Sequence, residues 1–295
     1  YKVMPAEPKI HNGEWDLVVE PKSSLFKLNF KEVWRYRDLL LLLVRRDFVA
    51  YYKQTILGPI WFFLQPLLTT AMYFLIFFKV AKLSTDEVPP LLFYLAGVTI
   101  WNYFSESLTK TSDTFIANAA IFGKVYFPRL VIPISIVVSN LMRLGIQFIL
   151  FIVFWLYYLL GTHSVHPHWE AILLLPVLIV LMAGLALGLG IIFSSLTTKY
   201  RDLRFLLSFG IQLLMFATPV VYPLSLASEK YKWLLLANPF TAIIETFRYA
   251  FLGKGEFSWM YLGYSSLVTI IILLIGTLIL KKKMKKNLNQ FNKSF

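Results

Sequence analysis

The strongest constraint on the fold is a set of long apolar runs that carry no charge. Residues 60–78, for example, contain no Asp, Glu, Lys or Arg over nineteen positions, and a helix needs about 20 apolar residues to cross about 30 Å of hydrocarbon. Only 15% of all residues are charged and 58% are hydrophobic, whereas soluble domains carry roughly 25% charged residues. The sequence therefore predicts an all-α membrane protein with about six transmembrane helices, over residues 60–80, 91–108, 130–160, 171–196, 205–222 and 259–280.

The residues before the first apolar run have a different character. Residues 1–30 are polar and contain three prolines, which disfavour helix, so they are predicted to form an extended cytoplasmic arm. In residues 31–57 basic side chains recur at nearly helical spacing, and the longest apolar run there, residues 39–44, is too short to span a membrane. This combination predicts an amphipathic helix in the membrane interface. The transmembrane domain is expected over residues 58–280.

Residues 224–258, between the fifth and sixth predicted spans, contain two apolar stretches that are each too short to cross a membrane. Asn238 and Pro239 separate the two stretches. The pattern predicts a re-entrant helical hairpin on the outer face, named here the gate hairpin. Non-helical backbone at membrane depth is tolerated only where protein or a water-filled cavity covers it. The hairpin therefore indicates a gated pathway.

Lysine and arginine are distributed unevenly between the two sides that six spans define. The side that holds both termini carries 22 of the 29 basic residues, about six lie on the other side, and Arg143 lies within a span. Cytoplasmic loops carry an excess of Lys and Arg, so both termini are predicted to be cytoplasmic, with residues 281–295 as a basic tail. The net charge of +13 then needs no nucleic-acid partner, because most basic residues flank apolar runs.

Residue types that carry chemistry are sparse. The chain has no cysteine, which excludes disulfides, thiolate metal sites and cysteine nucleophiles. It contains no phosphate-binding loop of the Gly-x-x-x-x-Gly-Lys-Ser/Thr type, so no ATP site is expected. His163, His166 and His168 lie in one predicted outer loop without an acidic cluster, and an exposed polar loop is favoured over a metal site. We therefore expect no catalytic, cofactor-binding or metal-ligating residue in this chain.

Charged residues in the apolar segments are more informative, because each costs several kcal/mol unless it is paired or wetted. Arg143 lies well inside the third span, and structural pairing and a pathway role are equally open for it. Glu245 and Arg248 are three residues apart, so they share a helix face and can pair. That pair is either a local salt bridge that steadies the hairpin or part of a gate. Glu106, at the end of the second span, is expected to be interfacial.

Small and aromatic residues offer weaker signals. Gly184 and Gly188 form a Gly-x-x-x-Gly pattern in the fourth span, for which tight packing within the subunit is favoured over dimerisation. Aromatic residues make up 17% of the chain. Most are expected to belong to the interfacial belt, although aromatic faces also suit the C–H faces of sugars. The pathway candidates are Trp61, Phe62, Tyr73, Trp101 and Arg143.

Several stretches resemble one family closely. They begin with Glu32-Val33-Trp34-Arg35-Tyr36-Arg37-Asp38-Leu39-Leu40 and Arg46-Asp47, and continue with Tyr52-Lys53-Gln54-Thr55-Ile56-Leu57-Gly58-Pro59, Gly123-Lys124-Val125-Tyr126-Phe127-Pro128-Arg129-Leu130-Val131-Ile132-Pro133, Tyr200-Arg201-Asp202-Leu203-Arg204, Ala217-Thr218-Pro219-Val220-Val221-Tyr222-Pro223, Asn238-Pro239-Phe240 and Glu245-Thr246-Phe247-Arg248. The chain is similar in these stretches, which cover most of residues 30–255, to the membrane permeases of ATP-binding-cassette exporters for lipid-linked polysaccharides, as in O-antigen and teichoic acid export.

The resemblance implies a permease subunit that is not itself an enzyme. It implies a homodimer in the cytoplasmic (inner) membrane, two copies of a separate ATPase that bind ATP and Mg, and a lipid-linked glycan as substrate. The residues that it assigns to ATPase coupling are Arg35, Arg37, Asp38, Arg45, Arg46, Asp47, Gly123, Lys124, Tyr126, Phe127, Pro128 and Arg129. It also marks a cytoplasmic loop motif, Tyr200, Arg201 and Asp202, and an outer gate formed by Asn238, Pro239, Glu245 and Arg248.

An integral membrane enzyme that acts on lipid-linked sugars is the main alternative. Such an enzyme would need acidic or histidine residues gathered at one membrane face, and the predicted outer acids are scattered along the chain. A secondary transporter would usually show inverted repeats, and the sequence contains no evident internal repeat. The sequence therefore favours the permease, and leaves open which glycan it carries and whether a long polymer is threaded or a short one flipped.

Overall fold

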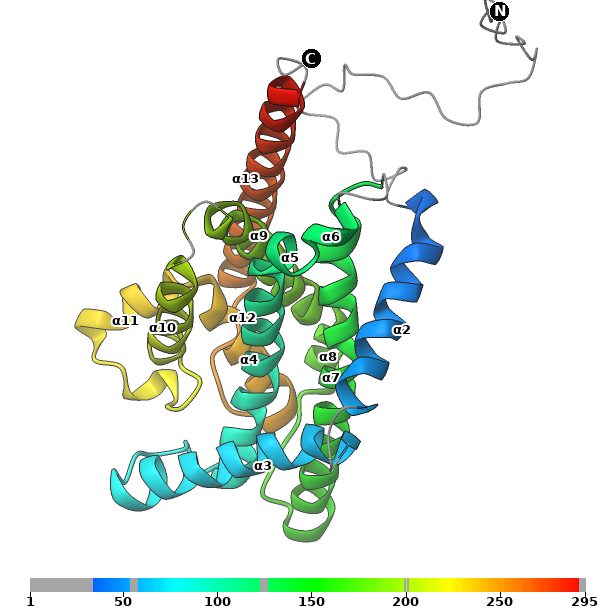
Figure 1. Cartoon of the computed structure of the whole chain (residues 1–295). Coiled ribbons are helices and arrows are strands. Elements are labelled where there is room, and N and C mark those ends of the chain that lie inside the picture. The colour runs from blue at the N-terminus through cyan, green and yellow to red at the C-terminus, as the bar shows by residue number, and fades with distance from the viewer. Residues whose placement is uncertain (1–33, 54–57, 123–126, 199, 201, 292–295) are drawn as a thin grey trace, which may run out of the picture.

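A computed structural model describes residues 34–53, 58–122, 127–198, 200 and 202–291. The predicted arm, residues 1–30, lies outside the described residues. Within the described part every regular element is a helix, which confirms the predicted all-α class (Figure 1). The elements are α2 (Arg37–Lys53), η1 (Gly58–Ile60), α3 (Trp61–Tyr73), η2 (Phe74–Val80), α4 (Pro90–Ser112), α5 (Thr114–Ala117), α6 (Ala119–Phe122), α7 (Val131–Leu156), η3 (Tyr157–Thr162), α8 (Trp169–Ile172), α9 (Leu175–Thr197), α10 (Leu203–Phe216), η4 (Leu224–Leu226), α11 (Glu229–Leu236), α12 (Pro239–Leu252) and α13 (Trp259–Phe291).

Four helical stretches among the described residues are long and apolar enough to cross a membrane. They are Trp61–Val80, Val131–Thr162, Trp169–Thr197 and Trp259–Lys282, and they correspond to the first, third, fourth and sixth predicted spans.

The second and fifth predicted spans correspond to α4 and α10, which differ from these four. Sixteen of the 23 residues of α4 are buried, and a helix wrapped by other helices tolerates more polar residues than one that faces lipid. In contrast, α10 has 14 residues. At about 1.5 Å per residue it is about 21 Å long, less than the roughly 30 Å of a hydrocarbon core.

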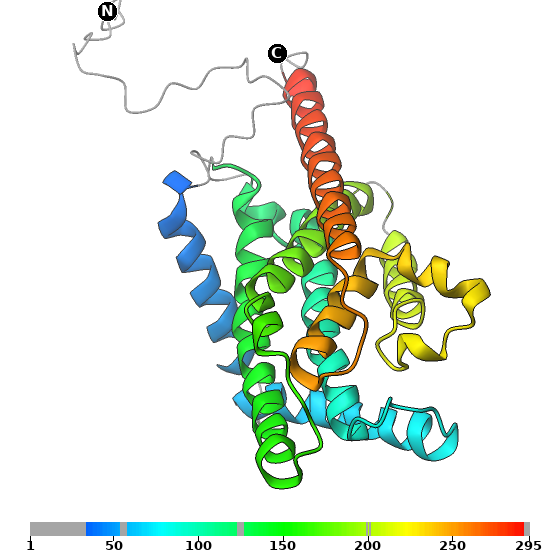
Figure 2. The same ribbon diagram turned by 180° about the vertical axis from the view of Figure 1, so that it is seen from behind.

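The long helices do not all run in one direction. The views in Figures 1 and 2 agree that α4, α7, α9 and α13 follow the long axis of the molecule, whereas α3 and η2 cross one end of it at a large angle. The amphipathic segment α2 lies along the first half of α7, where Leu43 packs with Val131, Ile132 and Ile136. The first predicted span is therefore the one long apolar stretch of the described part that lies crosswise.

The connections between the helices gather at two ends of the molecule. The α4–α7 connection, the α9–α10 connection and the C-terminal end of α13 share one end, named here the inner end (Figures 1 and 2). The connections η2–α4, η3–α8, α10–α11 and α12–α13 share the opposite half, named here the outer end. This grouping agrees with the two sides that the charge count defines.

A seam of small residues joins α9 to its neighbours in the centre of the molecule. A Cβ added at Gly188 would lie 2.8 Å from Ile272 Cγ2, and one added at Gly276 would lie 2.8 Å from the Gly188 carbonyl O. A Cβ added at Gly190 would lie 2.5 Å from Thr111 Cβ of α4. Such spacing lets helix backbones approach. It confirms that the Gly-x-x-x-Gly pattern serves packing within the subunit.

Candidate functional site

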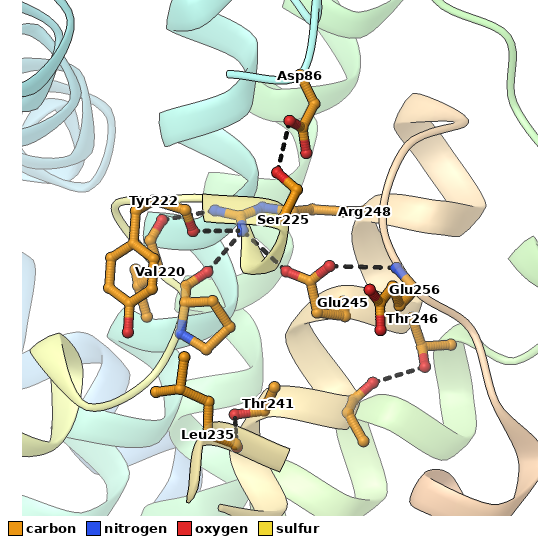
Figure 3. Close-up of polar contacts among 12 residues, drawn as sticks. Asp86, Val220, Tyr222, Ser225, Leu235, Thr241, Glu245, Thr246, Arg248 and Glu256 are labelled. Atoms are coloured by element: carbon orange, nitrogen blue, oxygen red, sulfur yellow. Dashed lines mark hydrogen bonds and ion pairs between the residues drawn. The ribbon is translucent and has the colours of Figure 1, made fainter. Parts of the chain in front are cut away.

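Arg248 in the middle of α12 connects three elements. Its side chain is only 2% exposed. Nη1 donates hydrogen bonds to the carbonyl O of Pro219 at 2.5 Å and of Tyr222 at 3.3 Å, and Nη2 donates to that of Val220 at 2.6 Å (Figure 3). The guanidinium also lies 3.8 Å from the ring centroid of Phe93 on α4. A buried guanidinium needs several acceptors, and the carbonyls of a non-helical turn need donors. Arg248 therefore fastens the turn that follows α10 to α12 and α4.

Glu245, one helical turn before Arg248, holds a second segment. Its Oε1 accepts from Arg248 Nη1 at 3.2 Å, and its Oε2 accepts from the backbone N–H of Glu256 at 3.2 Å (Figure 3). Gly255 allows this approach: its φ is +124°, and a Cβ there would lie 2.9 Å from the Glu245 carbonyl O. The pairing predicted from the spacing is confirmed. Both partners also bind other segments, so the pair is more than a local salt bridge.

Asn238 and Pro239 begin α12 and attach it to the end of α10. Asn238 Oδ1 caps the helix by accepting from the N–H of Phe240 at 3.1 Å, and Pro239 occupies the first helical turn, where its missing N–H costs nothing. The Asn238 Nδ2 donates to the carbonyl O of Ala217 at 3.1 Å and to Thr218 Oγ1 at 2.8 Å. Asn238 and Arg248 therefore bind the same turn from two positions along α12, and the role of the four residues as a gate stays a prediction. Asn238, Glu245, Arg248 and the turn of residues 217–222 are named here the outer joint.

At the inner end, one ion pair connects α10 to the end of α4. Arg204 Nε, in the first turn of α10, lies 2.7 Å from Oδ1 of Asp113, which stands between α4 and α5. Nearby, Thr197 Oγ1 donates to the carbonyl O of Ser112 at 3.0 Å, so α9 and α4 are also bonded there. Asp113 and Arg204 are named here the inner joint. The predicted loop motif precedes Arg204, with Tyr200 and Asp202 exposed and Arg201 outside the described residues.

The residues predicted for ATPase coupling fall in or just before α2 and before α7, and the described parts of these two segments lie against each other. Phe127 is buried in one apolar cluster with Leu43 of α2. Further along α2, Arg46 pairs with Asp47 at 2.8 Å. Five of the predicted coupling residues are exposed, namely Arg35, Arg37, Asp38, Arg45 and Arg46; Asp47, Pro128 and Arg129 are half-buried. Gly123, Lys124 and Tyr126 lie outside the described residues.

Arg143 belongs to a polar cluster between α4 and α7. It forms an ion pair with Glu106, and its guanidinium lies 5.2 Å from the ring centroid of Phe62. Asn140 accepts a hydrogen bond from Lys110 at 3.3 Å. Arg143 therefore has the structural partner that the sequence left open, and its pathway role stays a prediction. The expectation that Glu106 is merely interfacial missed this contact, because α4 continues to Ser112 and brings Glu106 opposite α7.

Hydrogen bonds and ion pairs also join the exposed loops of the outer end. Ser225 Oγ donates to Asp86 Oδ1 at 2.7 Å, and Lys254 Nζ lies 2.9 Å from Glu87 Oε2. The hydrogen bond from Lys254 lowers the pKa of Glu87. Asp86 and Glu87 have φ angles of 53° and 65°, in the left-handed region that residues other than glycine rarely adopt. A cavity of about 10 Å³ near these residues holds about one water molecule, which is too small for a substrate.

The three loop histidines are dispersed in the structure. His163 and His166 are exposed, while the ring of His168 stacks on Tyr249 with centroids 4.0 Å apart. The backbone N–H of His168 donates to the carbonyl O of Ala250 at 2.9 Å. No group of three His, Cys, Asp or Glu residues within the described ranges has the spacing for a metal ion. His168 thus packs its loop against α12.

The aromatic pathway candidates differ in their surroundings. Trp101 is buried, with its ring centroid 6.0 Å from that of Phe240, and Phe62 is also buried. The hydroxyl of Tyr73 donates to Met215 Sδ of α10 at 3.3 Å. Trp61 is exposed. Their pathway role stays a prediction.

The arrangement described so far is that of a helical membrane protein in which Asn238, Glu245, Arg248 and Arg204 lie at joints between helices. Residues 38–252 match the sequence model of the family described as ABC-2 type transporter. This match covers most of the chain, and the chain belongs to the ABC-2 type transporter membrane family.

Individual relatives are similar over most of their length. The O-antigen export system permease protein RfbA of Klebsiella pneumoniae is 30% identical over 245 residues, which is 83% of this chain and 92% of the relative. A protein of the same name from Myxococcus xanthus is 32% identical over 223 residues, covering 75% of this chain and 83% of the relative. The polysialic acid transport protein KpsM of Escherichia coli is 22% identical over 225 residues, with the same two coverages. These relatives favour a transporter over the membrane enzyme.

Proposed function

We propose that this chain is the permease subunit of an ATP-driven exporter for lipid-linked polysaccharide of the O-antigen kind. The observation that carries the proposal is its similarity, at about 30% identity over 83% of the chain, to a permease named for O-antigen export. Two copies form one pathway across the cytoplasmic membrane. A separate ATPase chain, also present in two copies, binds ATP and Mg and supplies the energy.

The ATPase binds at the inner end. Support comes from the positions of the start of α2, of the α4–α7 connection and of the start of α10, which share that end (Figure 1), and from the basic residues predicted for the same side. Cytoplasmic surfaces of membrane proteins carry such an excess of positive charge. Both termini are therefore cytoplasmic, and the exposed charges of α2 face the partner.

ATP binding brings the two ATPase subunits together and moves α2 and the α4–α7 connection. The transmembrane helices of the two permease copies then separate far enough to admit the lipid anchor and its glycan. Hydrolysis resets the cycle. The permease itself contributes shape and moving contacts rather than catalytic groups.

Reconstitution of the complex in proteoliposomes tests this proposal. The chain is purified with its ATPase and supplied with polysaccharide linked to a lipid carrier, and with the free lipid carrier as a control. We expect the lipid-linked polysaccharide to stimulate ATP turnover several-fold and to become accessible to a lectin on the opposite side of the membrane. An ATPase variant that cannot hydrolyse ATP should abolish the transfer. Transfer that persists with that variant, or ATP turnover that no glycan changes, would contradict the proposal.

A further inference from the structure

Helix α10 is fastened at both ends and is loosely packed between them. Only Leu207 and Ile211 of its 14 residues are buried. The aromatic side chains of Phe205 and Phe209 are mostly exposed, and so is Leu213. Figure 1 places α10 beside the central helices rather than among them. The middle of this helix therefore has few contacts within the subunit that would resist a displacement.

The two attachments of α10 differ in strength. At the inner joint, the Asp113 and Arg204 side chains are 38% and 40% exposed, although the paired atoms Oδ1 and Nε are themselves covered. A partly exposed ion pair contributes less to stability than a buried one. At the outer joint, Arg248 and Glu245 are buried, and breaking a buried pair leaves a charge without a partner. The inner contact is thus the weaker attachment of α10, and the outer contact is the stronger one.

The position of Asp113 links the inner joint to the rest of the inner end. This residue begins the α4–α7 connection, and its carbonyl O accepts from the N–H groups of Ile116 and Ala117 in α5. Phe115 N–H also donates to Ser194 Oγ of α9, at 3.4 Å. A displacement of the α4–α7 connection therefore reaches Arg204 through one ion pair, without passing through the packed centre.

We propose that α10 is a strut that carries motion from the α4–α7 connection at the inner end to the gate hairpin at the outer end. The inference rests on the proposed function, because the ATPase supplies the motion. An α-helix is a stiff rod held by its own hydrogen bonds, and α10 spans about 21 Å between its joints. When Asp113 draws Arg204, α10 pivots about the turn of residues 219–222, which Arg248 holds. The segments beyond that turn, η4 and α11, then move.

The absence of cysteine in the chain allows a direct test with one introduced thiol. Leu226 in η4 is 47% exposed, so Leu226→Cys reports on the gate hairpin. In the complete permease–ATPase complex, the rate of reaction with a membrane-impermeant maleimide is measured with and without a non-hydrolysable ATP analogue. We expect the analogue to change this rate at least threefold.

Charge reversal at the inner joint supplies the decisive variants. In Leu226→Cys protein, Asp113→Arg or Arg204→Asp alone should make the labelling rate independent of the analogue, while the ATPase still copurifies. The exchanged pair, Asp113→Arg with Arg204→Asp, should restore the response, and so should Arg204→Lys alone. Restoration by the exchanged pair also excludes misfolding as the cause of the loss in the single variants.

A response that survives Arg204→Asp would overturn the strut, and so would a hairpin that never responds to the analogue in the parent protein. Glycan-stimulated ATP turnover is measured in the same samples and reports on the proposed function separately. Turnover stimulated by glycan with an unresponsive hairpin removes only the strut. A responsive hairpin without any effect of glycan removes only the proposed substrate.

Discussion

Helices α10 and α12 have the same length and opposite surroundings. Each contains 14 residues, yet twelve residues of α12 are buried and only two of α10 are. The less buried helix, α10, carries more large aliphatic residues, five Leu, one Ile and one Met against one Leu and two Ile in α12. Apolar content therefore does not account for the difference. What distinguishes α12 is its buried polar pair, Glu245 and Arg248, whose partners lie on other segments.

The difference shows how a helical membrane protein separates fixed from movable parts. Between helices in lipid, the hydrophobic effect provides little preference, so close packing and buried hydrogen bonds hold the structure together. Moving α12 would strip acceptors from Arg248. Tilting α10 about the turn that Arg248 holds would exchange one set of apolar contacts for another along its middle, because its polar contacts lie at its ends.

The largest effect that would test this comparison is the loss of the Arg248 side chain. Arg248→Ala leaves three carbonyl groups and Oε1 of Glu245 without the donor that Arg248 supplies, so we expect a cost of about 3–5 kcal/mol. Arg204→Ala on α10 is the matched variant and should cost no more than about 1 kcal/mol. Thermal unfolding of the purified protein in detergent measures both. Equal Tm values for the two variants would contradict the division into fixed and movable helices.

Truncation of one aromatic side chain on each helix should give the next largest difference. Phe247 on α12 is fully buried, with ring centroids of Phe151 and Phe251 at 5.4 Å and 4.8 Å, and Phe247→Ala should cost about 3 kcal/mol. Phe209 on α10 is 57% exposed, and Phe209→Ala should change the stability by about 0.5 kcal/mol or less. The same unfolding assay applies. A larger loss for Phe209→Ala would mean that a second surface covers α10.

Glycine substitutions compare α10 with the central seam at a smaller scale. A Cβ at Gly188 of α9 would meet Ile272 and the backbone of Leu273 within 3.0 Å, whereas one at Gly210 of α10 would meet nothing within 4 Å. Gly188→Ala should therefore destabilise by about 1–3 kcal/mol through overpacking. Gly210→Ala should stabilise by about 0.5–1 kcal/mol, because alanine favours helix. Changes of the same sign in the stability of the two variants would argue against this packing.

The exposed ion pair between Glu87 and Lys254 should have the smallest effect, and it should depend on pH. The hydrogen bond from Lys254 lowers the pKa of Glu87 below its ordinary value of 4.5. A lowered pKa stabilises the folded state above the unfolded pKa, and this contribution is lost as the pH falls through the folded pKa. The Tm difference between the parent and Glu87→Gln should be constant from pH 6 to pH 8 and should vanish in acid. A difference that grows in acid would have the wrong sign.

Local features of the fold were predictable from the sequence. Long uncharged runs predicted helices, Asn238-Pro239 predicted the break before α12, and the three-residue spacing predicted that Glu245 pairs with Arg248. These inferences involve residues within one helical turn or one run. The Gly-x-x-x-Gly pattern also indicated its role, because close helix packing requires small side chains wherever the partner lies.

Contacts between distant segments were not predictable in the same way. The residues around Asp113 do not indicate that it pairs with Arg204, and those around Arg143 do not indicate that it pairs with Glu106. Both pairs form because α4 packs against α7 and α10. The crosswise direction of α3 also depends on tertiary contacts, such as the ring of Tyr73 on α3 against Tyr94 on α4, with centroids 6.5 Å apart. The sequence pattern of α3 is equally compatible with a helix parallel to its neighbours.

The most direct test of the account is a distance measurement between spin labels in the complete permease–ATPase complex. One label pair joins exposed positions of α10 and α13, Ser208→Cys with Leu267→Cys; the reference pair joins α9 and α13, Val177→Cys with Leu267→Cys. Singly labelled protein corrects for distances between the two copies. We predict that a non-hydrolysable ATP analogue shifts the α10–α13 distance and leaves the α9–α13 distance unchanged. An α10–α13 distance that stays constant while the complex turns over ATP, or two distances that shift equally, would contradict the account.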